Sequence, residues 1–155
     1  MDQIVIENYD KNTGVSRVKL NTKYGTFDHS VTVSVEDKDI ENRHDGIRFA
    51  MYLCQIDKLR AKARAYRERG KGMTHAANVL YKANIDPELK YWNYTGDSIM
   101  VVRIQAEIAF DEARKCSEKA DKMEAEYPEM VESVLNARRA LRKHIEKKKE
   151  EDGEN

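Results

Sequence analysis

Two arginines near the C-terminal end of the chain, Arg138 and Arg142, have the spacing of an anion site. They are four positions apart, so on a helix their guanidinium groups lie one turn from each other and can converge on one phosphate or pyrophosphate. A nucleotide also needs a surface for its base, and the aromatic rings of Phe110, Tyr91 and Trp92 could stack on it. These five residues are the predicted ligand site.

A second concentration of charge lies in residues 58–71, where the predicted basic patch is Arg60, Arg64, Arg67 and Lys71 and the only acid is Glu68. The whole chain of 155 residues has 28 basic and 28 acidic side chains, so this charge is local. Basic residues gathered along one helix are typical of proteins that bind nucleic acid. Solvated helices whose opposite charges meet within or between subunits are the alternative.

Catalytic and metal-binding patterns are not found in the sequence. Cys54 and Cys116 do not form a CxxC pair, and the four histidines are scattered. We therefore expect a protein that is not an enzyme, has no cofactor or metal, and carries its cysteines as small buried residues on helices. No leader and no apolar run near 18 residues is found, which predicts a cytoplasmic protein without a membrane segment.

The first third of the chain has the pattern of β-strands. Residues 4–9, 15–21 and 26–35 are rich in β-branched side chains and alternate in part between apolar and polar. Gly14 and Gly25 fall between these runs, where a turn needs a positive φ. The pattern predicts an antiparallel meander with one apolar face, which a helix must cover.

Helical segments follow the strands. A helix that begins in the acidic residues 36–39 is expected to cover the sheet and to end at Gly70 and Gly72, and a short helix is expected over 74–83. Pro87 and Gly96 then exclude regular structure, and Asp97 or Ser98 can cap the next helix. The sequence KYWNYTG, 90–96, lies in this joint, where its aromatic side chains either wedge the next helix in place or line a pocket.

Beyond the joint, small side chains recur at the 4-3-4-3 spacing of a coiled coil. The stripe consists of Val102, Ala106, Ala109, Ala113, Cys116, Ala120, Met123 and Tyr127. Pro128 interrupts it and costs a helix about 3 kcal/mol, so we expect a helical hairpin there in preference to a kinked long helix. One chain is not expected to bury the stripe fully, which predicts a homo-oligomer through the C-terminal helices.

Together these patterns predict an α+β protein: a small N-terminal β-meander covered by a helix, followed by long C-terminal helices. The expected domains are an α+β anchor over residues 1–97, a helical arm over 98–149, and a disordered tail over 150–155. We expect a disordered tail because these last residues are mostly charged and include no apolar side chain that could pack against the rest of the chain.

This layout, with an aromatic residue and two arginines one turn apart, resembles phage-encoded anti-defence proteins, in particular the Thoeris anti-defence nucleotide-sponge family. The resemblance implies a non-enzymatic oligomer that sequesters a cyclic or phosphate-rich signalling nucleotide, with Phe110, Arg138 and Arg142 at the site. Two alternatives stay open. One is an anti-CRISPR-type inhibitor that binds a host defence protein such as a nuclease effector, and the other is a nucleic-acid-binding phage protein that uses the helix at 58–71.

Overall fold

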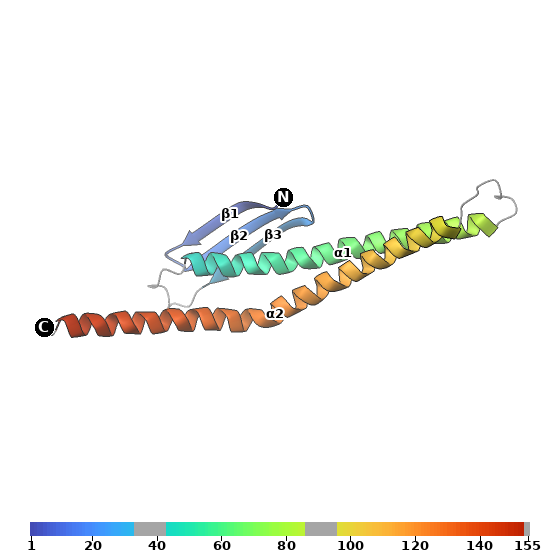
Figure 1. Ribbon diagram of the computed structural model, residues 1–155. Helices are drawn as coiled ribbons and strands as arrows, with labels where there is room; N and C mark the ends of the chain where they lie inside the picture. The colour runs from blue at the N-terminus through green and yellow to red at the C-terminus, as the bar shows by residue number, and fades with distance from the viewer. Residues whose placement is uncertain (33–42, 86–95, 154–155) are drawn as a thin grey trace. The chain divides into compact units, whose positions relative to one another are not determined.

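The computed structural model describes residues 1–32, 43–85 and 96–153, and it confirms the α+β class (Figure 1). The elements are β1 (Gln3–Asp10), β2 (Val15–Thr22), β3 (Gly25–Thr32), α1 (Arg43–Ile85) and α2 (Gly96–Gly153). Contacts divide the chain into unit 1, which is Met1–Lys58 with Asp121–Asn155, and unit 2, which is Leu59–Ala120. The predicted domain boundary at residues 97 and 98 is not tested by this grouping and stays a prediction.

The three strands form the predicted antiparallel meander in the order β1-β2-β3. Val18 in the central strand is opposite Glu7 of β1 and His29 of β3. The two glycines between the strands have the expected positive φ, 71° at Gly14 and 136° at Gly25. The end of the predicted third strand, residues 33–35, lies outside the described residues, as do the acidic residues 36–39.

The hydrophobic core of unit 1 lies between this sheet and the first turns of α1. Alternation along β2 buries Val18 and Leu20, which pack with Ala50 and Cys54 of α1. Phe27, Val31, Ile47 and Met51 surround these four residues. The other face of β2 is polar and carries Arg17, whose guanidinium donates hydrogen bonds to both carboxylate oxygens of Asp28 at 3.0 and 2.6 Å. The sheet therefore has one apolar face, and α1 covers that face, as the alternation along β2 predicts.

An aromatic cluster joins α1 and α2 within unit 1. Tyr127 of α2 stacks on Tyr52 with ring centroids 5.8 Å apart, and it meets the ring of Phe49 at 90° and 6.5 Å. The hydroxyl of Tyr52 donates a hydrogen bond to the backbone carbonyl of Met123 at 3.1 Å. Burial raises the pKa of both tyrosines, and the carboxylate of Glu126 adds to the shift at Tyr52. These contacts attach α2 to α1 immediately before Pro128.

The predicted helix end at Gly70 and Gly72 is wrong, because α1 runs through both glycines to Ile85 and includes the short helix expected at 74–83. Gly70 has a packing role instead. A Cβ atom at this position would stand 2.9 Å from the tip of the Phe110 ring, so the missing side chain makes room for that ring. At Gly72, apart from the neighbouring backbone of its own helix, no atom lies within 4 Å of the corresponding point.

The two glycines provide a matched test. Gly72→Ala is expected to raise the free energy of unfolding by about 0.5–1 kcal/mol, since alanine is the better helix former. Gly70→Ala is expected to be about 1–3 kcal/mol less stable than Gly72→Ala, because its Cβ displaces the Phe110 ring. Urea denaturation followed by circular dichroism measures both. In a Phe110→Ala background the two substitutions should become equivalent, and a difference that persists there would contradict the packing role.

The predicted hairpin at Pro128 is also wrong, since α2 is continuous from Gly96 to Gly153 with Pro128 inside it. Proline cannot donate a backbone hydrogen bond, but the aromatic cluster packs the turn immediately before it and favours continuation of the helix. Asp97 and Ser98 lie in the first turn of α2, and α2 also includes residues 150–153 of the expected tail.

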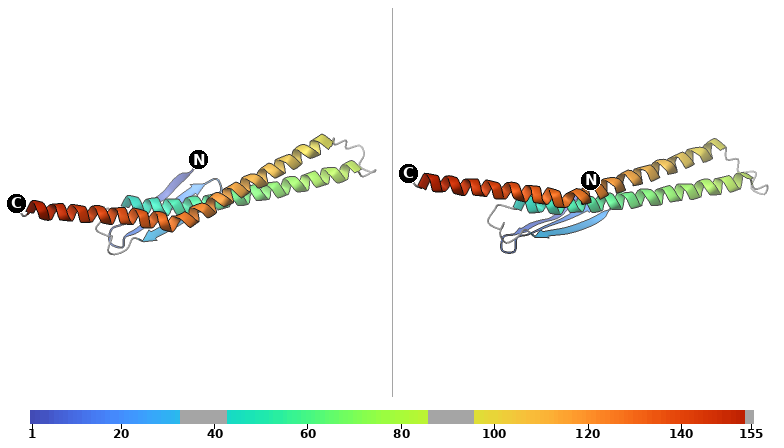
Figure 2. Two further views of the ribbon diagram at one scale, coloured as in Figure 1. Left: turned by 60° about the horizontal axis from the view of Figure 1, so that its bottom comes forward. Right: turned by 90° about the horizontal axis from the view of Figure 1, so that it is seen from below.

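The small-residue stripe on α2 is buried within one copy of the chain. Ala106, Ala109, Ala113, Cys116 and Ala120 are each at most 5% exposed. In unit 2 the two helices lie side by side (Figure 2), and the ring of Phe110 against Gly70 is one of their direct contacts. Small side chains let two helices approach closely, and α1 is the partner. The stripe therefore does not supply the unburied surface from which an oligomer was inferred.

Candidate functional site

Arg138, the first of the two predicted anion-binding arginines, is bound to a carboxylate of its own chain. Its Nε donates a hydrogen bond to Oδ2 of Asp45 at 2.8 Å, and its terminal nitrogen reaches Oδ1 at 3.4 Å. The Asp45 side chain is only 7% exposed, so this guanidinium satisfies a buried anion in the first turn of α1. Arg142 lies one turn further along α2, with its Nε 3.7 Å from Glu146. Arg138 thus already has the role of a structural ion pair.

The aromatic residues of the predicted ligand site fall into two groups. Phe110 is 38% exposed and points the tip of its ring at Gly70, so its contact is helix packing within unit 2. Tyr91 and Trp92 lie outside the described residues, together with the rest of the joint up to residue 95. The stacking role of these three residues stays a prediction.

The predicted basic patch forms one continuous stripe on α1, which we call the basic stripe: Arg60, Arg64, Arg67 and Lys71. Its 4-3-4 spacing keeps the side chains on one face of a helix. Arg64, Arg67 and Lys71 are exposed, and Arg60 is half-buried. Lys71 contacts Glu68 at 3.0 Å, whereas no ion pair reaches Arg64 or Arg67 from the part of the chain that the structure describes. Two of the four cations are therefore open to an external anion.

Charge elsewhere in unit 2 is largely compensated. On α2, Arg114 contacts Asp111 at 2.6 Å and Glu118 at 2.9 Å, and Lys115 contacts Asp111 at 3.1 Å. The hydrogen bond from Arg114, followed by that from Lys115, lowers the pKa of the Asp111 carboxyl. These ion pairs within one helix form a solvated face of alternating charges. By contrast, Leu59–Ile85 of α1 contains one acidic residue, Glu68. It contains seven basic residues, of which Lys62 contacts Glu112 of α2 at 3.8 Å: Arg60, Lys62, Arg64, Arg67, Arg69, Lys71 and Lys82.

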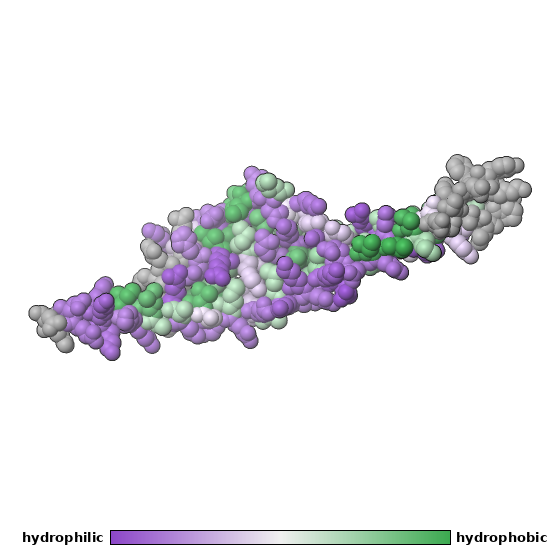
Figure 3. Space-filling view, in the orientation of Figure 1, coloured by the Kyte–Doolittle hydropathy of each residue, from purple (hydrophilic) through white to green (hydrophobic). Residues whose placement is uncertain are grey.

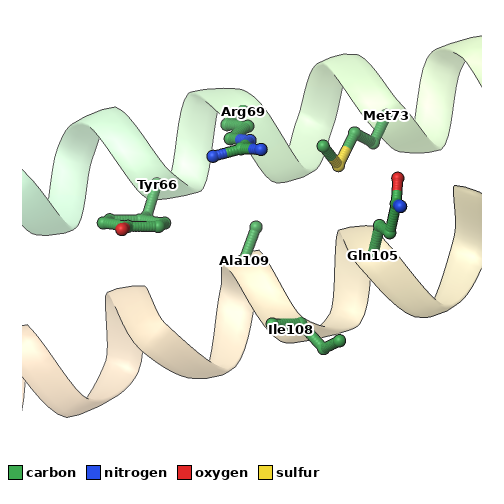
Figure 4. Close-up of a pocket in the computed structure, with 6 residues that line it drawn as sticks. All are labelled: Tyr66, Arg69, Met73, Gln105, Ile108 and Ala109. Atoms are coloured by element: carbon green, nitrogen blue, oxygen red, sulfur yellow. The ribbon is translucent and has the colours of Figure 1, made fainter.

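An open depression of about 200 Å³ lies between the two helices of unit 2 (Figure 4). Its lining is Tyr66, Arg69 and Met73 from α1 and Gln105, Ile108 and Ala109 from α2. The volume is below the range of about 300–1,000 Å³ that is typical of small-molecule sites. Arg67 and Arg69 are two positions apart, about 200° around the helix, so the depression and the basic stripe are on different sides of α1.

Nucleophilic and metal-binding groups do not assemble into a second site in the described part of the chain. Cys54 is buried, with its Sγ 3.6 Å from the carbonyl oxygens of Val18 and Phe27, and burial raises the pKa of its thiol to about 11. Cys116 is buried as well, as predicted for both. His29 Nε2 lies 2.5 Å from Asp57, and within the described ranges no three metal-ligating residues come together.

Sequence reasoning missed two features that the fold brings together. The Asp45–Arg138 pair joins residues from opposite ends of the helical region, and no local spacing could indicate it. The exposed apolar residues of α2 at Met100, Ile104 and Ile108 do have a signal, an i, i+4, i+8 spacing separate from the small-residue stripe. That spacing places them on one side of the helix.

Comparison of the sequence with protein-family models and with curated proteins, and of the fold with solved structures, found no match. No helix in the described part of the chain combines the length and the apolar character needed to cross a bilayer.

Proposed function

We propose that the protein is a non-enzymatic nucleic-acid-binding protein that holds the phosphates of a duplex along the basic stripe of α1. The observation that carries the proposal is the stripe itself, with three exposed cations on one helix face and no ion pair at Arg64 or Arg67 within the described residues. Phosphate contacts of this kind supply affinity without sequence information.

The length of the stripe suits a linear polyanion. From Arg60 to Lys71 the helix rises about 16 Å at about 1.5 Å per residue, and one strand of B-DNA presents a phosphate about every 3.4 Å. His75 and Lys82 are exposed and continue the same face towards the end of α1. No aromatic side chain occupies the stripe positions, so the face lacks the stacking surface that single-stranded ligands use. A duplex backbone is therefore the favoured ligand.

The test is binding of a random-sequence duplex by fluorescence anisotropy over a range of salt concentrations. The variant R64Q/R67Q/K71Q is expected to bind about 500-fold more weakly at about 0.1 M salt, because three phosphate contacts contribute about 2.7 to the slope of log K against log salt, counted from about 1 M. The matched control K147Q/K148Q/K149Q also removes three exposed lysine charges, from the end of α2, and should retain binding. Equal losses in both variants would contradict a site on the stripe.

Further arms of the experiment separate the alternatives. Capture of a signalling nucleotide, which the resemblance implies, predicts that purified protein retains a small nucleotide and that R138A/R142A abolishes its retention. Because Arg138 binds Asp45, that variant also needs a stability measurement. Retention of a nucleotide without duplex binding would overturn the stripe proposal and favour the nucleotide sponge. Co-purification of a host defence protein without either ligand would favour the inhibitor alternative.

A further inference from the structure

An exposed apolar surface of unit 2 lies on α2 and reaches the depression at Ile108. Met100, Val101, Ile104 and Ile108 of α2 are 60, 52, 48 and 64% exposed. Of these four residues, Ile108 also lines the depression, together with the half-buried Tyr66 and Met73 of α1. We call these residues the apolar flank. In Figure 3 apolar side chains gather over the part of unit 2 where α1 and α2 lie side by side.

Such a surface is unusual on a chain that is otherwise rich in charge. Single exposed apolar residues are normal, but four on one side of a helix, continuous with a depression between two helices, are typical of an interaction surface. The small-residue stripe is already covered by α1, whereas the apolar flank is exposed and can be covered by a partner. The occupant can be inferred from the charges at its two edges.

The edges of the apolar flank carry opposite charges. Arg69 stands at the α1 edge, where it lines the depression, and Glu107 stands at the α2 edge, next to Ile108 and three positions after Ile104. Both side chains are exposed, and no ion pair in the described part of the chain involves either. Since Ile108 lines the same depression as Arg69, and Glu107 precedes it directly, the two charges lie at the same level along the helix pair.

We propose that two copies of the chain associate through the apolar flank, around a two-fold axis parallel to the helices of unit 2. Such an axis places α1 of one copy opposite α2 of its partner, and a two-fold interface must be complementary to itself. Arg69 of each copy then faces Glu107 of the other at both edges, while the exposed apolar residues are buried between them. The side chain of Gln105 and the guanidinium of Arg69 supply polar contacts beside this apolar centre.

The arrangement leaves the proposed nucleic-acid site accessible. The basic stripe and the depression are on different sides of α1, so the interface would cover the depression and leave Arg64, Arg67 and Lys71 exposed in both copies. The inference does not depend on the proposed function, because it rests on other residues and is measured in the absence of nucleic acid.

Sedimentation velocity on the full chain over a range of micromolar concentrations tests the interface. We expect the unmodified protein to be a dimer and I104E/I108E to be a monomer with unchanged circular dichroism, since both residues are exposed within one copy. The matched control is Val79→Glu, at a position of α1 that is 50% exposed and does not line the depression; it should remain a dimer. An unmodified protein that is monomeric throughout would overturn the proposal.

Charge exchange tests the two-fold arrangement and does not require a change in the apolar centre. Arg69→Glu and Glu107→Arg are each expected to weaken dimerisation about tenfold, because each places like charges together at two symmetric edges. The double exchange R69E/E107R should restore the affinity of the unmodified protein. If each single exchange weakens the dimer and the double exchange weakens it further, the two-fold arrangement is wrong. A dimer that persists in I104E/I108E would assign association to another surface, such as the C-terminal half of α2.

Discussion

Phe49→Ala is expected to lower the free energy of unfolding by about 3–5 kcal/mol, the range observed when a buried phenylalanine is truncated. Phe49 is 1% exposed and is among the largest fully buried side chains of the described residues. Its ring meets Tyr127 edge to face, so truncation removes burial in α1 and an aromatic contact to α2 together. The loss should appear as a lower urea midpoint by far-ultraviolet circular dichroism.

Phe110→Ala is the control for this prediction, because it removes the same ring from a position that is 38% exposed. Less apolar area is buried at Phe110, so the expected loss is about six-tenths of that for Phe49→Ala. Similar losses in the two variants would show that the aromatic cluster of Phe49, Tyr52 and Tyr127 does not stabilise unit 1 as its geometry indicates.

The double substitution A106L/A113L is expected to destabilise the chain by about 2–6 kcal/mol, since each overpacked core position typically costs about 1–3 kcal/mol. Ala106 and Ala113 are 3 and 2% exposed on the stripe that packs against α1. A leucine at either position must push the helices of unit 2 apart. The two sites are about 10 Å apart along α2, so their effects should be nearly additive.

Ala65→Leu is the matched control, because Ala65 is an exposed alanine of the same unit. This substitution should change the free energy of unfolding by less than about 0.5 kcal/mol, as is usual for surface positions. If A106L/A113L were instead as stable as the unmodified protein, the stripe would not be closely packed. Sedimentation of A106L/A113L adds a second measurement, since leucines that the chain cannot bury would promote association of the variant.

Features encoded by short-range patterns could be predicted from the sequence. Alternation along β2 identified the buried face with Val18 and Leu20, and Gly14 and Gly25 marked turns that need a positive φ. The coiled-coil spacing of α2 identified which alanines are buried. The basic stripe was also predictable, because helical spacing alone decides which basic residues share a face.

Other features depended on residues that are distant in sequence. Local rules end a helix at Gly70 and turn the chain at Pro128, yet both positions are helical. Gly70 accommodates Phe110 of the other helix, and the turn before Pro128 is packed by Phe49 and Tyr52. The cost of a glycine or a proline in a helix is about 1–3 kcal/mol, which tertiary packing can exceed.

The sequence by itself determined which elements form, which of their faces are apolar, and where positive charge gathers. Only the tertiary structure decided what covers each face. It showed that α1 covers the small-residue stripe, that Asp45 binds Arg138, and that the apolar residues around Ile104 stay exposed. The physical reason is that the period of a pattern is set by the local backbone, whereas the choice of partner is set by packing and by compensation of buried charge between distant segments.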